Sequence, residues 1–265
     1  MGKIIIVASG KGGTGKTTFT SQAGTQLALL GNLTVLVDAD AGFRNLDIAL
    51  GLESSVVYDY SDYINGGADL DDILIKSPYN ENLYFVAAPQ SAATSDFDKD
   101  RTRLFWESLK SRFDYVIADA PAGMGDGFSF AAEYADEAVI VSLAESASLR
   151  DADRVIEELE CVGVDTIRLV LNRIKPELIE KKVLMNVDDC MDVLSIPLLG
   201  IIPDDIEVTE LVPNGALIAQ TDKGAGKAFC NIVRRMMGSN VPIMDMDEGR
   251  KKGFFLRIRK TFKKS

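Results

Sequence analysis

The residues Gly10-Lys11-Gly12-Gly13-Thr14-Gly15-Lys16-Thr17 fit the pattern G-x-x-x-x-G-K-[ST]. They follow an apolar run at residues 4–8 and precede a helix-like stretch, which is the strand–loop–helix setting that the pattern requires. In such a loop, glycines let backbone N–H groups surround phosphate oxygens, and the helix N-terminus adds partial positive charge. The sequence therefore predicts a cradle for ATP, in which Lys16 reaches the β- and γ-phosphates and Thr17 ligates Mg²⁺. The expected cradle residues are Gly10, Lys11, Gly12, Gly13, Thr14, Gly15, Lys16, Thr17 and Thr18.

Apolar segments rich in β-branched residues alternate with helix-like segments along the chain. We predict strands at residues 4–8, 34–37, 83–87, 115–118, 138–143, 166–171 and 198–202, and helices at residues 16–30, 99–112, 128–135, 148–161, 183–194 and 225–237. Each predicted strand is apolar throughout, as expected for a parallel sheet covered on both faces. The alternation predicts a doubly wound α/β fold with a mostly parallel sheet and helices on both faces. We expect one P-loop domain at residues 1–237, a flexible linker at 238–253 and a short amphipathic helix at 254–265.

The composition excludes several classes of function. The chain has no histidine, which rules out histidine-based acid–base catalysis and most zinc sites. Its three cysteines, Cys161, Cys190 and Cys230, are far apart and form no C-x-x-C pair, so we expect reduced thiols in the cytosol. No apolar run is long enough to span a bilayer or to form the core of a signal peptide.

Carboxylates follow two of the predicted strands. Asp38 and Asp40 come at the end of the second strand, and Asp119 ends the strand that begins at Tyr115. Because the carboxyl ends of parallel strands face the ligand crevice, these groups are candidates for a metal shell or for positioning water. Asp119 fits the Walker B pattern, in which an aspartate holds Mg²⁺ through water. For Asp38 and Asp40, helix capping or simple solvation remains the alternative interpretation.

Lys11 is a second lysine in the loop, and an ordinary phosphate loop does not need it. The loop K-G-G-T-G-K-T resembles the deviant Walker A loop of the ParA/MinD family. The stretch D-x-D-x-G-x-R-N-L-D at residues 38–47 resembles the family's switch I, and D-A-P-A-G at residues 119–123 resembles its switch II. The resemblance implies that Lys11 reaches across a dimer interface to the partner's nucleotide. It also implies that Asp40 orients the attacking water, that Asp38 supports the Mg²⁺ shell, and that the Gly123 N–H senses the γ-phosphate.

Three further segments resemble family features. Asn172 and Arg173 end one strand, and Pro203 and Asp204 end another, in places where relatives contact the base. The resemblance implies that the Asn172 amide reads the adenine edge, although a polar residue at a strand end can also be a turn residue. Residues 148–154 resemble a segment for partner contact, where Arg150 and Asp153 could instead form a surface ion pair.

The C-terminus has a charge opposite to that of the body. Net charge is −11, of which residues 249–265 contribute +8, leaving −19 for the rest. On a helix of 100° per residue, Phe254, Phe255, Ile258 and Phe262 share one face. The opposite face carries basic side chains, namely Arg257, Arg259, Lys260, Lys263 and Lys264. This pattern is typical of a helix that lies on an anionic membrane, where each basic side chain adds about 1 kcal/mol. Alternatives are docking on the chain's own domain or a calmodulin- or nucleic-acid-binding tail.

The resemblance covers the whole chain, and the terminal helix points to the family's division-site members. It implies ATP hydrolysis by a nucleotide-bound homodimer on the cytoplasmic membrane face. It also implies septum placement by recruitment of a division inhibitor, MinC, with an ATPase activator, MinE or an equivalent. Anionic lipids are expected as partners, and nucleic acid is not.

Four rivals remain. A ParA-type DNA-segregation ATPase needs a basic surface, which an acidic body disfavours. A flagellar-number regulator would share the loop. A membrane scaffold that binds ATP without turnover would not need Lys11 and Asp40. A nitrogenase-reductase-like electron carrier needs cysteines that follow the Walker B strand, where this chain has none.

The terminal helix generates a prediction. Ile258→Glu should release the protein from anionic liposomes, because it places a charge at the centre of the apolar face. ATP binding should stay intact, since the helix lies far along the chain from the loop. Co-sedimentation with liposomes measures the release, and unchanged membrane binding would contradict the interpretation of the tail.

Overall fold

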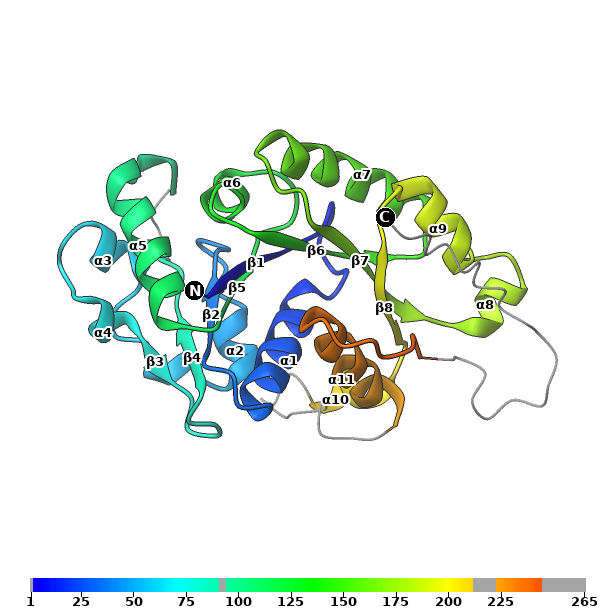
Figure 1. The fold of residues 1–265 in the computed structure, drawn as a ribbon, viewed down its shortest axis with the longest axis horizontal. Coiled ribbons are helices and arrows are strands. Elements are labelled where there is room, and N and C mark those ends of the chain that lie inside the picture. The colour runs from blue at the N-terminus through cyan, green and yellow to red at the C-terminus, as the bar shows by residue number, and fades with distance from the viewer. Residues whose placement is uncertain (1, 91–93, 212–222, 245–265) are drawn as a thin grey trace.

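The computed structural model describes residues 2–90, 94–211 and 223–244. Its centre is an eight-stranded sheet in the order β3-β4-β2-β5-β1-β6-β7-β8 (Figure 1). All neighbouring strands are parallel except β3, which is antiparallel to β4. The strands are β1 (Lys3–Ala8), β2 (Thr34–Asp38), β3 (Ile75–Lys76), β4 (Leu83–Val86), β5 (Tyr115–Asp119), β6 (Glu137–Leu143), β7 (Ile167–Ile174) and β8 (Leu198–Pro203). This confirms the predicted doubly wound, mostly parallel α/β fold.

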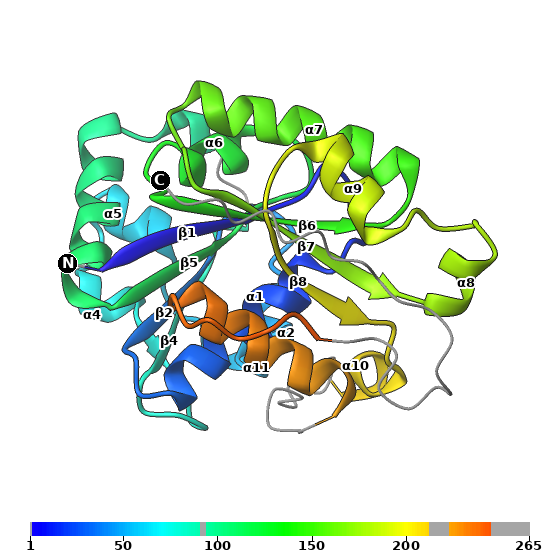
Figure 2. The ribbon, with the colours of Figure 1, turned by 45° about the vertical axis from the view of Figure 1, so that its right-hand side comes forward.

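Helices cover both faces of the sheet (Figures 1 and 2). On one face lie α1 (Lys16–Leu29), α2 (Leu46–Leu50) and α11 (Gly224–Met236), with α10 (Ile206–Leu211) beside them. The other face is covered by α5 (Lys99–Arg112), α6 (Asp126–Ala132), α7 (Ser146–Cys161) and α9 (Val187–Leu194). The remaining elements are the short helices η1 (Glu53–Ser55), α3 (Tyr60–Ile64), α4 (Leu70–Ile73), η2 (Thr94–Asp96) and α8 (Pro176–Glu180).

The continuous apolar runs of the strands follow from burial on both faces. In β1, Ile4 and Ile6 belong to the core beneath α5, α6 and α7, whereas Ile5 and Val7 belong to the core beneath α1 and α11. Successive side chains of a strand point to opposite faces, so every position of a covered central strand must be apolar. The central strands therefore leave polar groups only at their ends, and the site is built there.

The predicted elements match the structure where they are long. All seven predicted strands are present, and the helix predicted at residues 99–112 has these bounds. The helix predicted at residues 183–194 is wrong in its first turn, because α9 begins at Val187. The Asn186 side chain accepts a hydrogen bond from the Asp189 N–H at 2.8 Å, so it caps the helix and fixes its start.

The chain after α11 packs back onto the domain. The Arg235 guanidinium donates to the carbonyls of Leu198 and Leu199 on the edge strand β8, at 3.1 and 2.8 Å, and to Val241 at 2.8 Å. Ile243 and Met244 then pack against the two cores. These contacts cover part of the exposed edge of β8.

The terminal helix expected at residues 254–265 lies outside the described residues. Within the described ranges, no helix is long and apolar enough to cross a membrane.

A stability prediction follows from α5. Trp106 is completely buried among aromatic rings, whereas Leu104 on the same helix is 53% exposed. Trp106→Ala should lower the free energy of unfolding by about 3–5 kcal/mol, because it leaves a cavity in the core. Leu104→Ala, as the matched control, should change it by about 0.5 kcal/mol or less. Urea titrations measure both values, and a similar loss in the two variants would contradict the assignment of this core.

Candidate nucleotide-binding site

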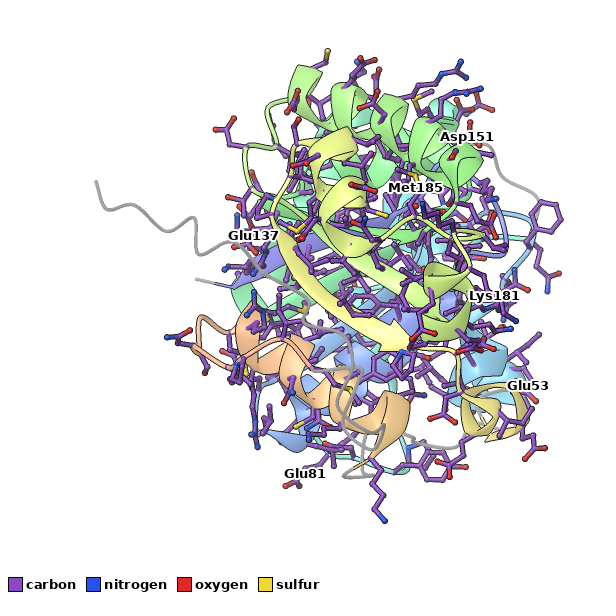
Figure 3. The ribbon with its side chains drawn as sticks, turned by 90° about the vertical axis from the view of Figure 1, so that its right-hand side faces the viewer. Glu53, Glu81, Glu137, Asp151, Lys181 and Met185 are labelled. Atoms are coloured by element: carbon purple, nitrogen blue, oxygen red, sulfur yellow. The ribbon has the colours of Figure 1, made fainter. Side chains whose placement is uncertain are left out.

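The glycine-rich loop joins β1 to α1 at the carboxyl edge of the sheet. Gly13 and Gly15 have φ angles of 78° and 97°, which side chains rarely adopt. Gly10 is required for a different reason: a Cβ there would lie 2.2 Å from the Asp151 carbonyl carbon of α7. Figure 3 shows Asp151 on α7, on the side of the molecule opposite Glu137 at the start of β6. The loop is thus held between two glycine turns and the backbone of a neighbouring helix.

Lys16 is buried at the start of α1 and is held by Ser9. Its Nζ donates to the Ser9 Oγ at 2.9 Å, and this hydroxyl donates to the Lys11 carbonyl at 2.7 Å. Burial lowers the pKa of Lys16, while the Asp119 and Asp40 carboxylates oppose that effect. The lysine therefore provides a partly desolvated positive charge beside the loop, where a phosphate would be bound.

Asp119 receives two hydroxyl hydrogen bonds from α1. Thr17 donates to its Oδ2 at 2.6 Å, and Thr20 donates to its Oδ1 at 3.0 Å. Burial raises the pKa of Asp119 to about 6, although both hydroxyls and Lys16 act in the opposite direction. Thr20 was not predicted, but its spacing of three residues from Thr17 on a helix places both on one face.

The oxygens at this position suit Mg²⁺, which prefers hard oxygen ligands and octahedral geometry. Because the Thr17 hydroxyl gives its hydrogen to Asp119, its lone pairs remain available to a cation. In the described part of the chain, no group of three His, Cys, Asp or Glu side chains forms a complete metal site. Thr17 would therefore hold the ion with phosphate and water oxygens, and Asp119 would bind that water. Bound there, Mg²⁺ would neutralise charge on the phosphates.

Asp38 lies beside Asp119, because β2 and β5 pair these two residues directly. The Asp38 Oδ1 accepts from the Asp40 N–H at 2.9 Å, and its Oδ2 accepts from the Leu46 N–H at 3.2 Å. Burial and the neighbouring Asp119 carboxylate raise the pKa of Asp38 to about 7. Asp38 thus holds the shape of the loop at residues 38–47. Burial also raises the pKa of Asp40, which is less deeply buried, while Lys16 lowers it.

Switch II lies against the phosphate loop. Gly123 has a φ of 81°, and its N–H donates to the Ser9 carbonyl at 3.2 Å. The structure thus places this N–H beside the phosphate loop, where the Ser9 carbonyl is its acceptor. Ser9 contacts Lys16, Lys11 and Gly123, and the sequence motifs did not identify it, because it precedes the G-x-x-x-x-G-K-[ST] pattern.

A cleft of about 310 Å³ continues the phosphate site toward β7 and β8. It brings together the predicted base contacts Asn172, Arg173, Pro203 and Asp204 with residues of α1 and α2. The Asn172 Nδ2 donates to the Thr14 carbonyl at 2.7 Å, and its Oδ1 accepts from the Arg173 N–H at 2.9 Å. Asn172 therefore ties the end of β7 to the phosphate loop. The structure adds Asn45, Ile48, Ala49, Asp205 and Val208 to the lining.

Lys11 lies at the rim of the site. Its Nζ is 3.2 Å from the Glu145 Oε2 of the same chain, and both side chains are partly exposed. Glu145 was not predicted, because 134 residues separate it from Lys11. Arg150 and Asp153 are both exposed on α7, which packs against the phosphate loop at Gly10.

A glycine-rich phosphate loop, a buried lysine and carboxylates at the ends of parallel strands define a P-loop nucleoside-triphosphatase of the doubly wound class. A family model described as "CobQ/CobB/MinD/ParA nucleotide binding domain" matches residues 5–218. The chain belongs to this family and is an ATPase, as the loop and switch motifs predicted.

Several proteins named MinD are similar to the chain along most of its length. The chain is 41% identical over 247 residues to the septum site-determining protein MinD of Synechocystis, covering 92% of this chain and 93% of that protein. Its structure is similar to a chain of the MinC:MinD cell division protein complex of Aquifex aeolicus, with 36% identity, a TM-score of 0.85, and 92% and 99% of the two chains covered. It is also similar to MinD of Pyrococcus horikoshii complexed with Mg-ADP, with 27% identity, a TM-score of 0.80, and 91% and 100% covered.

Removal of the buried lysine tests the phosphate cradle. Lys16→Ala should abolish ATP binding, a loss of more than about 100-fold, because the variant lacks the charge beside the phosphates. Lys99→Ala, which removes an exposed lysine at the start of α5, should retain the wild-type affinity. Titration with a fluorescent ATP analogue measures both, and retained affinity in Lys16→Ala would refute the assignment of the cradle.

Asp38 predicts a dependence of stability on pH. Its pKa is about 7 in the folded protein and ordinary in the unfolded chain, so the folded state binds more protons between about pH 4 and 7. The free energy of unfolding should therefore fall as pH rises through this window, by up to about 1.4 kcal/mol per pH unit. Asp38→Asn should give a shallower slope. Urea titrations from pH 5 to 7.5, without nucleotide or Mg²⁺, test this, and equal slopes would contradict it.

Proposed function

We propose that the chain is a membrane-associated, dimerising ATPase that places the division septum by recruiting a division inhibitor. The single observation that carries this proposal is a complete P-loop site that also contains a second lysine, Lys11, at its rim. Relatives named septum site-determining protein MinD support the role in division, since the chain aligns with nearly the full length of one of them. The similarity to a chain of the MinC:MinD complex favours a MinC-type inhibitor as partner.

Dimerisation would bring a second lysine to each phosphate site. Lys11 is only 33% exposed and pairs with a carboxylate of its own chain, so it lies at the surface without being fully solvated. In the proposed dimer, Lys11 leaves Glu145 and contacts the partner's bound phosphates, so that hydrolysis depends on association. An activator, MinE or an equivalent, would accelerate this step.

Hydrolysis would use the groups that surround Lys16. Asp40 would orient the attacking water, since it is a half-buried carboxylate close enough to Lys16 for each to change the pKa of the other. Lys16 would bind the β- and γ-phosphates, and the Gly123 N–H would leave the Ser9 carbonyl to bind the γ-phosphate. Asn172, Arg173, Pro203 and Asp204 would contact the base from the adjoining cleft.

Membrane attachment would use the C-terminal residues 254–265. One copy of so short a helix is a weak anchor, because it must fold as it binds. Two copies on a dimer gain from effective concentration, so ATP would switch attachment to the cytoplasmic membrane face on, and hydrolysis would switch it off.

Co-sedimentation with anionic liposomes tests the proposal. The full chain and a truncation after Gly249 are compared with ATP, with ADP and without nucleotide. ATP alone should drive the full chain onto lipid, and the truncation should stay in solution under all three conditions. Sedimentation that is the same with ATP, with ADP and without nucleotide, or that never occurs, would overturn the switch. Binding to duplex DNA would then be measured as the sign of a ParA-type role.

A further inference from the structure

The loop at residues 38–47 closes on itself around Asp40. The Asp38 carboxylate holds both ends of the loop through the Asp40 and Leu46 N–H groups. The Asp40 carbonyl accepts from the Phe43 N–H at 3.2 Å and from the Arg44 N–H at 3.4 Å. The backbone of Asp40 is therefore fixed from two directions, and one of them depends on the conformation of Arg44.

Arg44 has a strained backbone. Its φ is 40°, in the left-handed region that residues other than glycine rarely adopt. Such a conformation is unfavourable by itself and persists only where surrounding contacts hold it in place.

The Arg44 side chain supplies such a contact. Its Nε and Nη2 donate to the Asp47 Oδ2 at 3.1 and 2.8 Å, and the Asp47 Oδ1 accepts from the Ile48 N–H at 2.7 Å. The two side chains are only 15% and 5% exposed. Separating a pair this deeply buried is costly, because each charge would be left uncompensated and out of water. The two side chains therefore keep this geometry.

The chain contains a comparison pair with the same spacing. Arg103 and Asp100 on α5 also lie three residues apart and bond at 2.8 Å, but their side chains are 58% and 82% exposed. Exposed pairs of this kind contribute little to structure. Burial, and not the presence of an ion pair, therefore distinguishes the switch I pair.

We propose that the Arg44–Asp47 pair is a positioning clamp for Asp40 in ATP hydrolysis. The clamp holds Arg44 in its left-handed conformation, which keeps the Arg44 N–H on the Asp40 carbonyl and the Asp40 carboxylate aimed at the water. Neither residue lines the base cleft, and the pair is linked to Asp40 through the Arg44 N–H. This inference rests on the proposed role of Asp40. A displacement of about 1 Å at such a group can cost about 100-fold in rate.

Separate measurements of turnover and of ATP affinity test the clamp. Arg44→Lys and Asp47→Asn in the full chain should each lower kcat by at least about tenfold with Mg-ATP and anionic liposomes, while the Kd for ATP changes by less than about threefold. Arg103→Lys, the matched control on α5, should leave both values unchanged. Wild-type kcat in both clamp variants, or a loss of affinity as large as the loss of kcat, would overturn the proposal.

A third variant covers the case in which these two fold poorly. The double variant Arg44→Gly/Asp47→Asn removes the backbone strain together with both charges of the pair, so no buried charge is left without a partner. It should therefore fold about as stably as the wild type and still hydrolyse ATP slowly. A wild-type rate in this variant would show that Asp40 needs no clamp.

Combination with Asp40→Ala separates the clamp from the proposed function. If Arg44 acts through Asp40, Arg44→Lys should lower the residual rate of Asp40→Ala no further. An additional loss in the double variant would overturn the clamp. Wild-type turnover in Asp40→Ala alone would instead remove Asp40 from the proposed mechanism, whereas a slow Asp40→Ala beside fast clamp variants would refute only the clamp.

Discussion

The site depends on the burial of two carboxylates side by side. Asp38 and Asp119 are 1% and 2% exposed and are direct partners in the pairing of β2 with β5. Buried charges of like sign must be compensated or protonated. Lys16, the hydroxyls of Thr17 and Thr20, and two backbone N–H groups supply that compensation, so the start of α1 and the loop after β2 are placed around this pair. The architecture of the phosphate site follows from this electrostatic requirement.

The three aspartates of the site have different surroundings, and these separate their chemistry. Asp119 is bound by side-chain hydroxyls, Asp38 by backbone N–H groups, and Asp40 is only half-buried. The first arrangement suits a metal-bound water, the second stabilises the loop, and the third leaves a carboxylate within reach of solvent. The surroundings of each aspartate, and not its residue type, therefore determine its role, as in other sites with paired carboxylates.

The features that depend on a local sequence pattern could be predicted from the sequence. The phosphate loop, the central strands and the long helix α5 were evident, because each depends on contiguous residues. β3 has only two residues, too few for any periodicity, and α3 and α4 are too short for a helical stripe. Both helices do begin with capping boxes, at Asp59 with Asp62 and at Asp69 with Asp72, which is a signal that could have been used. Glu145 near Lys11 and Thr14 beneath Asn172 depend on contacts across 134 and 158 residues, which only the folded sheet brings together.

The contact of Gly10 with α7 has a mechanical consequence. Where two stretches of backbone touch directly, no side chain can rotate to absorb a movement of either one. A small tilt or slide of α7 is therefore passed to the phosphate loop as a displacement of similar size. The outer face of α7, with Arg150 and Asp153, is exposed. A protein that binds this face and shifts α7 would change the affinity of the site for nucleotide. Nucleotide binding would then change the affinity for that protein by the same factor.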